Sequence, residues 1–219
     1  MMQVRYVAVA MIAVLLAAAA GFGAPPAGTG PASSAAPATA RAVIEKVTQS
    51  ALAVLRDASL SAADKRERVR QIAYDNMDFD TLARLALGRP WRTLSDAKKA
   101  EFVAEFKKHV AATYGHTTDQ YTDEDIKVTG DRDEADGDST VDTSIIGTKD
   151  GVRQEVAKVG YRMRKKDGKW NIIDVNIDGI SLMGNFREQF QEIMDQGGID
   201  QVIKSLREKN AAAEKTDSK

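Results

Sequence analysis

Two segments decide the fold: Val156-Ala-Lys-Val-Gly-Tyr-Arg-Met163 and Trp170-Asn-Ile-Ile-Asp-Val-Asn-Ile177. The chain then runs through Gly179-Ile-Ser-Leu-Met183 into an amphipathic segment that begins Asn185-Phe-Arg-Glu-Gln-Phe190. The pattern of the first two segments predicts β-strands, and that of the last predicts a helix. The strands are apolar at more positions than one buried face requires, and no catalytic constellation accompanies them. This combination indicates a container for an apolar molecule.

The N-terminus has the order of a secretory signal peptide. Residues 1–5 carry one positive charge, residues 6–20 are an apolar run, and glycines follow at positions 21 and 23. The run is shorter than the roughly 20 apolar residues that span a bilayer, so a cleaved signal over residues 1–23 is favoured over an uncleaved membrane anchor. Cleavage after Ala20 and cleavage after Gly23 both satisfy the small-residue rule.

Composition limits the classes of protein that remain. The chain has no cysteine, which excludes an acylated lipoprotein anchor, disulfides and thiol chemistry. Residues 24–40 form a Pro/Ala-rich leader, residues 41–210 a single domain, and residues 211–219 a polar tail. The chain has 31 basic and 32 acidic residues, and loss of Arg5 with the signal leaves a net charge near −2. Such a charge gives no support to nucleic-acid binding.

The remaining pattern predicts an α+β domain. Helices are expected over residues 41–59, after Ser61, over 79–87 and over 96–121; strands over 126–129, 140–147, 153–164 and 169–182; and helices again over 185–195 and 199–209, with a break at Gly197-Gly198. Charged turns that contain glycine separate the strands, which favours an antiparallel meander. We therefore expect a four-stranded, twisted antiparallel sheet packed against a layer of helices, with an apolar lipid cavity between them.

The cavity-lining residues are predicted from the apolar faces of these elements. In the last strand, Trp170 and Ile172 are expected on one face and Ile173, Val175 and Ile177 on the other, so that both faces are apolar. Two ordinary packed faces without a cavity remain an alternative. The candidate lipid-binding residues are Phe102, Phe106, Val141, Ile145, Val159, Tyr161, Met163, Ile172, Val175, Leu182, Met183, Phe186 and Phe190.

Sites for catalysis or metal binding are not evident. His109 and His116 are seven residues apart, whereas a helical metal pair needs a spacing of four, so both are expected to face solvent or to cap. Ser181 lacks the flanks of a nucleophile elbow and is expected to cap the strand-to-helix junction. Asp174 and Asp178 could form a polar rim, or an acid–base pair within a cone-shaped pocket. No catalytic residue, metal or cofactor is therefore predicted.

Taken in order, the motifs resemble the MlaC, or toluene-tolerance, family of periplasmic phospholipid-binding proteins. The resemblance covers residues 44–209 and departs from the family at Pro90. It is carried by Leu87-Gly-Arg-Pro-Trp91-Arg92, by Phe102 and Phe106, by residues 114–121, by Thr140-Val-Asp-Thr143, by Val159-Gly-Tyr161-Arg-Met163, by residues 168–175, by Gly179-Ile-Ser181-Leu182, by residues 185–190 and by Gly197.

The resemblance implies a monomeric periplasmic carrier for phospholipid. Such a carrier exchanges its ligand with an outer-membrane lipoprotein–porin complex and an inner-membrane ABC lipid transporter, and so maintains outer-membrane lipid asymmetry. It leaves open whether the ligand is a glycerophospholipid or a hopanoid-type lipid. An enzyme that uses a buried Asp174 or Asp178 as general base, and a structural envelope protein that binds no ligand, remain alternatives. Candidate docking charges lie at residues 65–68, at Arg70, at Arg89 and Arg92 beside Trp91, and at residues 164–166.

Overall fold

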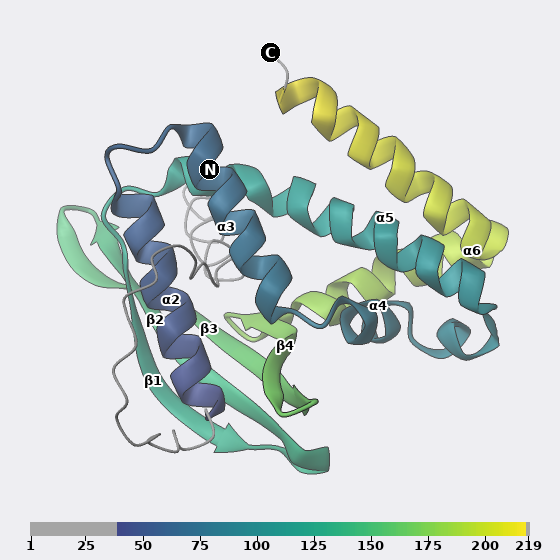
Figure 1. Cartoon of the computed structure of the whole chain (residues 1–219), viewed down its shortest axis with the longest axis horizontal. Helices are drawn as coiled ribbons and strands as arrows, with labels where there is room; N and C mark the ends of the chain where they lie inside the picture. The colour runs from purple at the N-terminus through teal and green to yellow at the C-terminus, as the bar shows by residue number, and fades with distance from the viewer. Residues whose placement is uncertain (1–38, 218–219) are drawn as a thin grey trace, which may run out of the picture.

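The computed structural model describes residues 39–217, apart from the side chains of residues 114–117 and 216–217. The predicted signal peptide, residues 24–38 of the leader and residues 218–219 lie outside the described residues. The domain is α+β, and its antiparallel sheet has the strand order β1-β2-β3-β4-β5 (Figure 1). The strands are β1 Asp125–Asp133, β2 Asp138–Lys149, β3 Val152–Lys166, β4 Lys169–Ile177 and β5 Ile180–Ser181. The predicted meander is confirmed.

The sheet has five strands, so the predicted number of four is wrong. The expected strand over residues 169–182 turns back at Asp178-Gly179, and the two residues of β5 pair with Asn176 and Ile177 of β4. Three hairpins use the same two-residue turn: Asp150-Gly151, Asp167-Gly168 and Asp178-Gly179 all have positive φ at both positions. This is the type I′ geometry, for which Asp-Gly is a preferred pair because its twist matches that of the strands.

Polar side chains set the helix boundaries. The helices are α2 Ala40–Arg56, α3 Ala62–Asn76, α4 Phe79–Leu87, α5 Asp96–Gly115 and α6 Leu182–Asp217, with short 3-10 turns η1 Arg89–Thr93, η2 His116–Gln120 and η3 Ala135–Gly137. Thr39, Ser61 and Asp78 accept hydrogen bonds from the first turns of α2, α3 and α4. The helix expected over residues 96–121 ends at Gly115, and a 3-10 turn follows it.

The two predicted C-terminal helices form one kinked element. Gly197 and Gly198 leave helical geometry within α6, as their sequence indicated. A Cβ at Gly197 would lie 2.8 Å from the Cβ of Gln201, so the kink needs a glycine there. The element starts at Leu182 rather than residue 185 and continues beyond residue 209 to Asp217.

The helices cover one face of the sheet. Helix α2 packs on β1 and β2, whereas α3, α4 and the first part of α6 pack on β4. Helix α5 packs mainly on α3, α4 and α6, and it forms an outer layer together with the C-terminal part of α6 (Figure 1). The hydrophobic core therefore lies between the sheet and the inner helices, and it extends between the inner and outer helices.

A β-bulge decides which side chains of β4 enter this core. The pairing of β3 with β4 passes from Arg162↔Asp174 to Met163↔Ile172, which leaves Ile173 unpaired. The bulge resets the alternation, so Ile172, Val175 and Ile177 all join the core cluster. The expectation that Ile172 lies on the opposite face from Val175 and Ile177 is wrong for this reason. Ile173 is fully buried but lies outside the cluster.

Gly168→Ala should lower the free energy of unfolding by about 1–2 kcal/mol, because Gly168 has a φ of 82° and side chains with a Cβ are strained there. No atom lies within 4 Å of the added Cβ, so the loss would report the backbone alone. Gly130→Ala is the matched control, since Gly130 has no positive φ and equal space. Urea unfolding checks both variants, and equal losses would contradict the role of the turn.

Candidate ligand-binding site

All thirteen predicted lipid-binding residues belong to one buried apolar cluster. None has more than 5% of its surface exposed, and Phe102, Phe106, Val141, Ile145, Tyr161, Met163 and Val175 have none. The members come from β2, β3, β4, α5 and α6, which are far apart in sequence. Tertiary packing thus brings together residues that were chosen only from the faces of separate elements.

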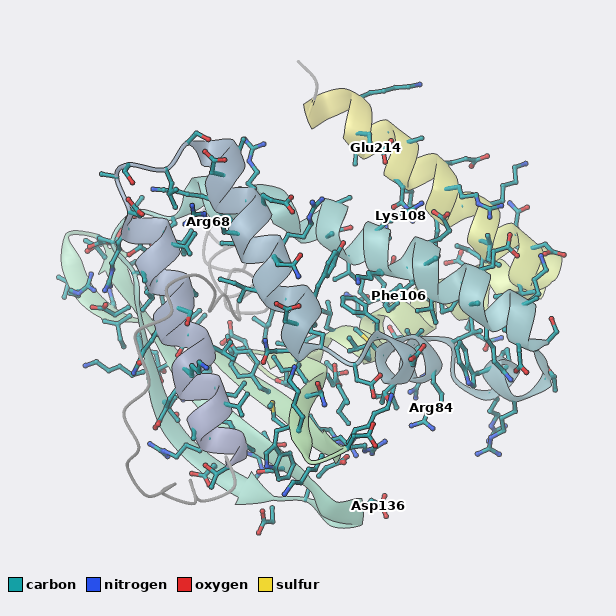
Figure 2. The ribbon with its side chains drawn as sticks, in the orientation of Figure 1. Arg68, Arg84, Phe106, Lys108, Asp136 and Glu214 are labelled. Carbon is teal, nitrogen blue, oxygen red and sulfur yellow. The ribbon has the colours of Figure 1, made fainter. Side chains whose placement is uncertain are left out.

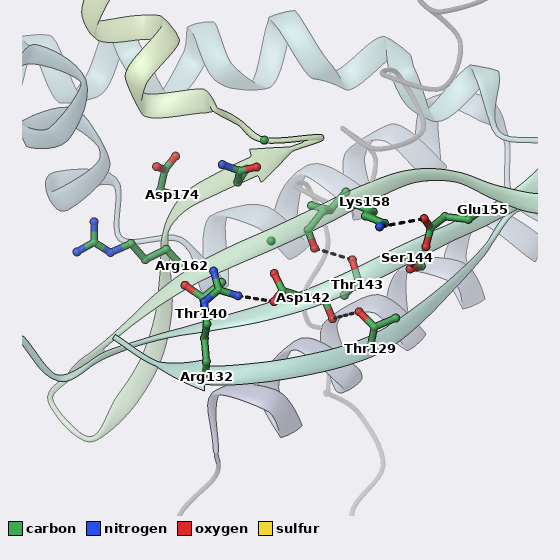
Figure 3. Close-up of a pocket in the computed structure, with 14 residues that line it drawn as sticks. Thr129, Arg132, Thr140, Asp142, Thr143, Ser144, Glu155, Lys158, Arg162 and Asp174 are labelled. Atoms are coloured by element: carbon green, nitrogen blue, oxygen red, sulfur yellow. Dashed lines mark hydrogen bonds and ion pairs between the residues drawn. The ribbon is translucent and has the colours of Figure 1, made fainter. Parts of the chain in front are cut away.

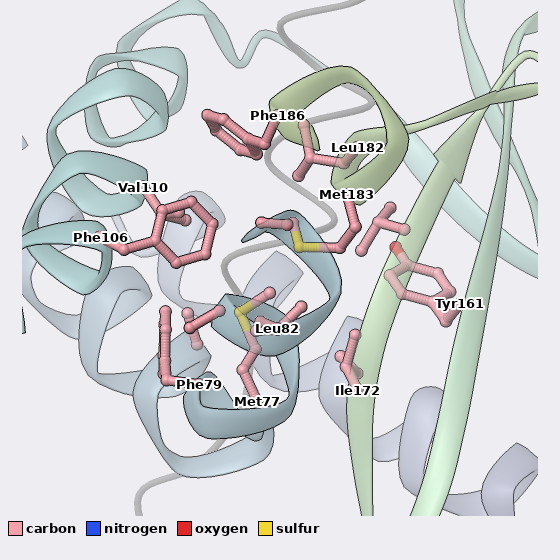
Figure 4. Packing of buried hydrophobic residues seen from close by; sticks show 14 of the residues in the cluster. Met77, Phe79, Leu82, Phe106, Val110, Tyr161, Ile172, Leu182, Met183 and Phe186 are labelled. Atoms are coloured by element: carbon pink, nitrogen blue, oxygen red, sulfur yellow. The ribbon is translucent and has the colours of Figure 1, made fainter. Parts of the chain in front are cut away.

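The cluster has two parts, which the sequence did not separate. Phe102, Phe106, Phe186 and Phe190 form an aromatic group between α5 and α6, with ring centroids 5.1–5.7 Å apart. Figure 4 shows Leu82, Met77 and Met183 between Phe106 on one side and the strand residues Tyr161 and Ile172 on the other. The aromatic group is therefore a helix–helix core, and only the remaining candidates lie close to the sheet.

The helical side of the sheet-facing part comes from elements that the prediction omitted. Helices α2, α3 and α4 supply buried apolar residues to the same cluster, namely Ile44, Val47, Ala51, Val69, Ile72 and Leu82. The sequence contains a signal for these residues, because they form apolar stripes at helical spacing. The stripes do not show which layer of the domain each helix will face.

One polar pair lies in the middle of this apolar surface. Tyr161 is fully buried, and its hydroxyl forms a hydrogen bond with Thr143, which is 1% exposed. Thr143 Oγ1 also donates to the carbonyl oxygen of Val159 at 3.1 Å. Burial raises the pKa of Tyr161 far above its ordinary value, so the phenol is neutral. The pair supplies hydrogen-bonding groups to the cluster without a charge.

Asp174 and Ser181 hold the junction between the sheet and α6. Asp174 Oδ2 accepts from Ser181 Oγ at 2.6 Å, while Oδ1 accepts from the backbone N–H groups of Val175 and Met183 at 2.8 and 3.0 Å. Ser181 Oγ accepts from the N–H of Gly184, which confirms its predicted capping role. Asp178 is exposed and accepts from the N–H of Lys158. The two carboxylates therefore serve the backbone at this corner and do not form an acid–base pair.

The opposite face of the sheet is open and polar. It carries a shallow pocket of about 580 Å³ lined mainly by polar and charged side chains, among them Arg132, Asp142, Lys158 and Arg162 (Figure 3). Arg132 forms an ion pair with Asp142. A Cβ at Gly160 would lie 3.0 Å from Asp142 Oδ1, which explains a glycine in the middle of a strand. This face is unsuited to acyl chains, so the apolar cluster is the candidate site.

Comparison with known proteins identifies the family. The family model described as MlaC protein matches residues 45–208. The chain belongs to the MlaC family. A phospholipid-binding protein from Ralstonia solanacearum, solved in complex with a phospholipid, is 22% identical and has a TM-score of 0.68. The alignment covers 80% of this chain and 99% of that chain, which shows a shared fold. No curated protein matches the chain.

Within the described part of the chain, no helix is sufficiently long and apolar to cross a membrane. The same residues contain no group of three or more His, Asp or Glu side chains arranged to hold a metal ion.

Most of the basic residues expected to dock partners of this MlaC-family protein are engaged within the domain. Lys65 donates to the carbonyl of Leu55, Arg66 pairs with Asp119, Arg70 with Glu67, Arg164 with Asp138 and Lys166 with Asp78. Burial alone would raise the pKa of Asp138, but the hydrogen bonds and charges of Arg164 and Arg162 lower it. Among the expected arginines, Arg68, Arg89 and Arg92 make no ion pair with a described residue.

His109 is not a solvent-facing residue. It is half-buried on α5, and its ring meets that of Phe186 at a centroid distance of 5.9 Å. The prediction that it faces solvent or caps a helix is wrong, because it lies within α5 and α6 folds back over this side of α5. Burial and the charge of Lys209 lower the pKa of His109, whereas the amide of Asn210 acts in the opposite direction. The side chain of His116 lies outside the described residues.

The unfolding free energy should fall as the pH drops below about 6.5, because His109 takes up a proton more readily in the unfolded chain than in the folded protein. The loss ends once the pH is below the depressed folded pKa. Urea unfolding at about pH 8 and about pH 5.5 measures this difference. His109→Gln should remove part of it, and His116→Gln, at the only other histidine, should not. An unchanged pH dependence in His109→Gln would contradict the assignment.

Proposed function

We propose that this protein is a periplasmic carrier that binds phospholipid and encloses its acyl chains within the apolar cluster between the sheet and the inner helices. The observation that carries the proposal is the cluster itself, which is continuous, lies between two layers and includes the neutral Tyr161, whose hydroxyl bonds to Thr143. Membership of the MlaC family and the fold shared with a phospholipid-bound structure support it.

The cluster residues are buried and packed against one another, so the layers separate to make space when acyl chains enter. The contacts of α2 suit such a movement. Its two ends are tied to β1 by Arg41–Asp131 and Arg56–Asp125, and these side chains are 40–49% exposed. Exposed ion pairs contribute about 0–1 kcal/mol each, so they break at little cost. Met77, Met163 and Met183 add unbranched, adaptable side chains on both sides of the cluster.

Energetics explain why a carrier is needed. A glycerophospholipid has about 30 methylene groups, and each contributes roughly 0.8 kcal/mol when it leaves water. Transfer of both chains therefore exceeds roughly 20 kcal/mol, which is beyond ordinary binding free energies. A lipid cannot escape through water at a useful rate. The carrier must shield the chains and release them when it is docked against another apolar acceptor, a task that needs no acid, base or nucleophile.

The cycle follows from these requirements. The carrier, exported by its signal peptide, receives or delivers lipid at an outer-membrane lipoprotein–porin complex and at an inner-membrane ABC lipid transporter, and thereby maintains outer-membrane asymmetry. The enzyme alternative is disfavoured because Asp174 and Asp178 accept hydrogen bonds from backbone N–H groups and do not pair with each other. A purely structural envelope protein would copurify without lipid, which makes the next experiment decisive.

Native mass spectrometry of protein purified from a membrane-containing lysate should show a bound mass equal to a two-chain phospholipid. Val175→Asn should lower the fraction of protein with bound lipid, because it places an amide on the cluster wall at a cost of about 1–3 kcal/mol. Ile173→Asn is the matched control: it is on the same strand and equally buried but lies outside the cluster, so the fraction that folds should retain lipid. Consistent absence of lipid from the unmodified protein would exclude the carrier.

Transfer of lipid to vesicles that contain the reconstituted ABC transporter should slow as salt rises, because exposed docking charges are screened within about 8 Å at physiological ionic strength. Lipid already bound should remain in the protein over the same series, since apolar burial holds its chains. Fluorescent phospholipid measures both quantities. Transfer that is independent of salt would refute a polar docking step and leave lipid carriage standing.

A further inference from the structure

The arginines of the domain divide sharply into two classes. Nine of the fourteen between residues 39 and 217 form ion pairs with Asp or Glu side chains. In that part of the chain, five have no carboxylate partner: Arg68, Arg84, Arg89, Arg92 and Arg187. Arg68 lies on α3, whereas the other four belong to α4, η1 and the first turns of α6, which pack together. We name these four residues the arginine patch.

Contacts within the domain place the patch on one surface. Arg187 donates from Nε and Nη2 to the carbonyl of Leu85 at 2.9 and 2.6 Å, and its side chain lies 3.4 Å from a Cβ built on Gly88. It therefore lies directly over the end of α4, next to the start of η1. Arg84, Arg89 and Arg92 are exposed, and Figure 2 shows Arg84 projecting outward from α4.

The surface around the arginine patch is positively charged, whereas the whole protein has a negative net charge. Residues 79–95 contain three arginines and one acidic residue, Asp80, which gives a local charge of +2 before Arg187 is added. The whole chain has a net charge of −1. The four guanidinium groups have no carboxylate partner among the described residues, so an anionic surface that meets them would gain charge-assisted hydrogen bonds.

A half-buried tryptophan lies within the patch. Trp91 is between Arg89 and Arg92, its inner edge meets Phe102 at a centroid distance of 6.5 Å, and Lys99 Nζ lies 6.0 Å from its ring. Tryptophan favours the headgroup level of bilayers, where an apolar ring and a polar edge are both accommodated. An acidic protein surface would satisfy the arginines but gives no reason for the aromatic ring.

We propose that the arginine patch docks the protein on a membrane surface rich in anionic phospholipid headgroups, with Trp91 at the level of the headgroups. The inner face of the same helix, α4, carries Leu82, Ala83 and Ala86 into the apolar cluster. Docking therefore brings the bilayer against a wall of the cluster. The proposal does not depend on lipid carriage, because it concerns only the outer surface of α4, η1 and α6.

Cosedimentation with protein-free vesicles tests the proposal. The purified protein should bind vesicles of phosphatidylcholine mixed with phosphatidylglycerol, and should not bind phosphatidylcholine alone. Arg89→Gln should weaken partitioning about fivefold, and the triple variant Arg84→Gln/Arg89→Gln/Arg92→Gln about 100-fold, as expected for separate charges near an anionic surface. Arg68→Gln removes the same charge outside the patch and should change partitioning less than twofold.

Fluorescence supplies a second measurement. The chain has two tryptophans, so Trp170→Phe leaves Trp91 as the only one, and its emission should shift to the blue on anionic vesicles. Failure to bind anionic vesicles, an equal loss in Arg68→Gln, or unchanged Trp91 emission in the bound state would overturn the proposal. Native mass spectrometry of the triple variant should still detect bound lipid. If bound lipid is lost in every variant, that result counts against lipid carriage and not against membrane docking.

Discussion

The structure depends on covering one apolar sheet face. Strands β2, β3 and β4 present Val141, Tyr161 and Val175 in adjacent register, and water can be excluded from them only by helices. Apolar burial of this kind is non-directional, so it specifies that the face is covered but not that it is covered permanently. The opposite face remains polar and open. A sheet with one apolar and one polar face holds the helical layer against its apolar face. Another apolar molecule could take the place of the helices on that face.

The attachments between the layers are unequal in strength. On the β4 side, the N–H of Asp78 donates to the carbonyl of Ile172 at 3.1 Å, Met77 forms a bridge with the same residue, and Asp174 binds the first turn of α6. Partly buried backbone contacts of this kind are expensive to leave unmade. On the β1 side, α2 is joined to the sheet by apolar contact and by exposed ion pairs. The β4 side is therefore the natural hinge, and the contact between α2 and the sheet is where the layers would separate.

Local sequence rules predicted much of this architecture. The Asp-Gly turns, the helix caps and the glycine kink act through the residues beside them, so the meander and the helix order follow from the sequence alone. The bulge at Ile173 does not, because whether two residues oppose one depends on the partner strand. The position of α4 between the aromatic group and the sheet is likewise a matter of long-range packing. The thirteen candidates are buried as expected. Four of them belong to a helix–helix core, which also depends on long-range packing.

The ion-pair partners of the basic residues could not be predicted from the sequence either. Basic runs at residues 65–68 and 164–166 were as plausible for docking as Arg89 and Arg92, but their partners Asp119, Asp138 and Asp78 come from distant parts of the chain. Among the five arginines of residues 39–217 that have no carboxylate partner, Arg68 lies on α3, and the other four lie on α4 and its neighbours, on the hinge side of the domain. A contact there holds the fixed wall of the cluster against a membrane and leaves α2 free to move. Docking and opening would then use different surfaces, so neither obstructs the other.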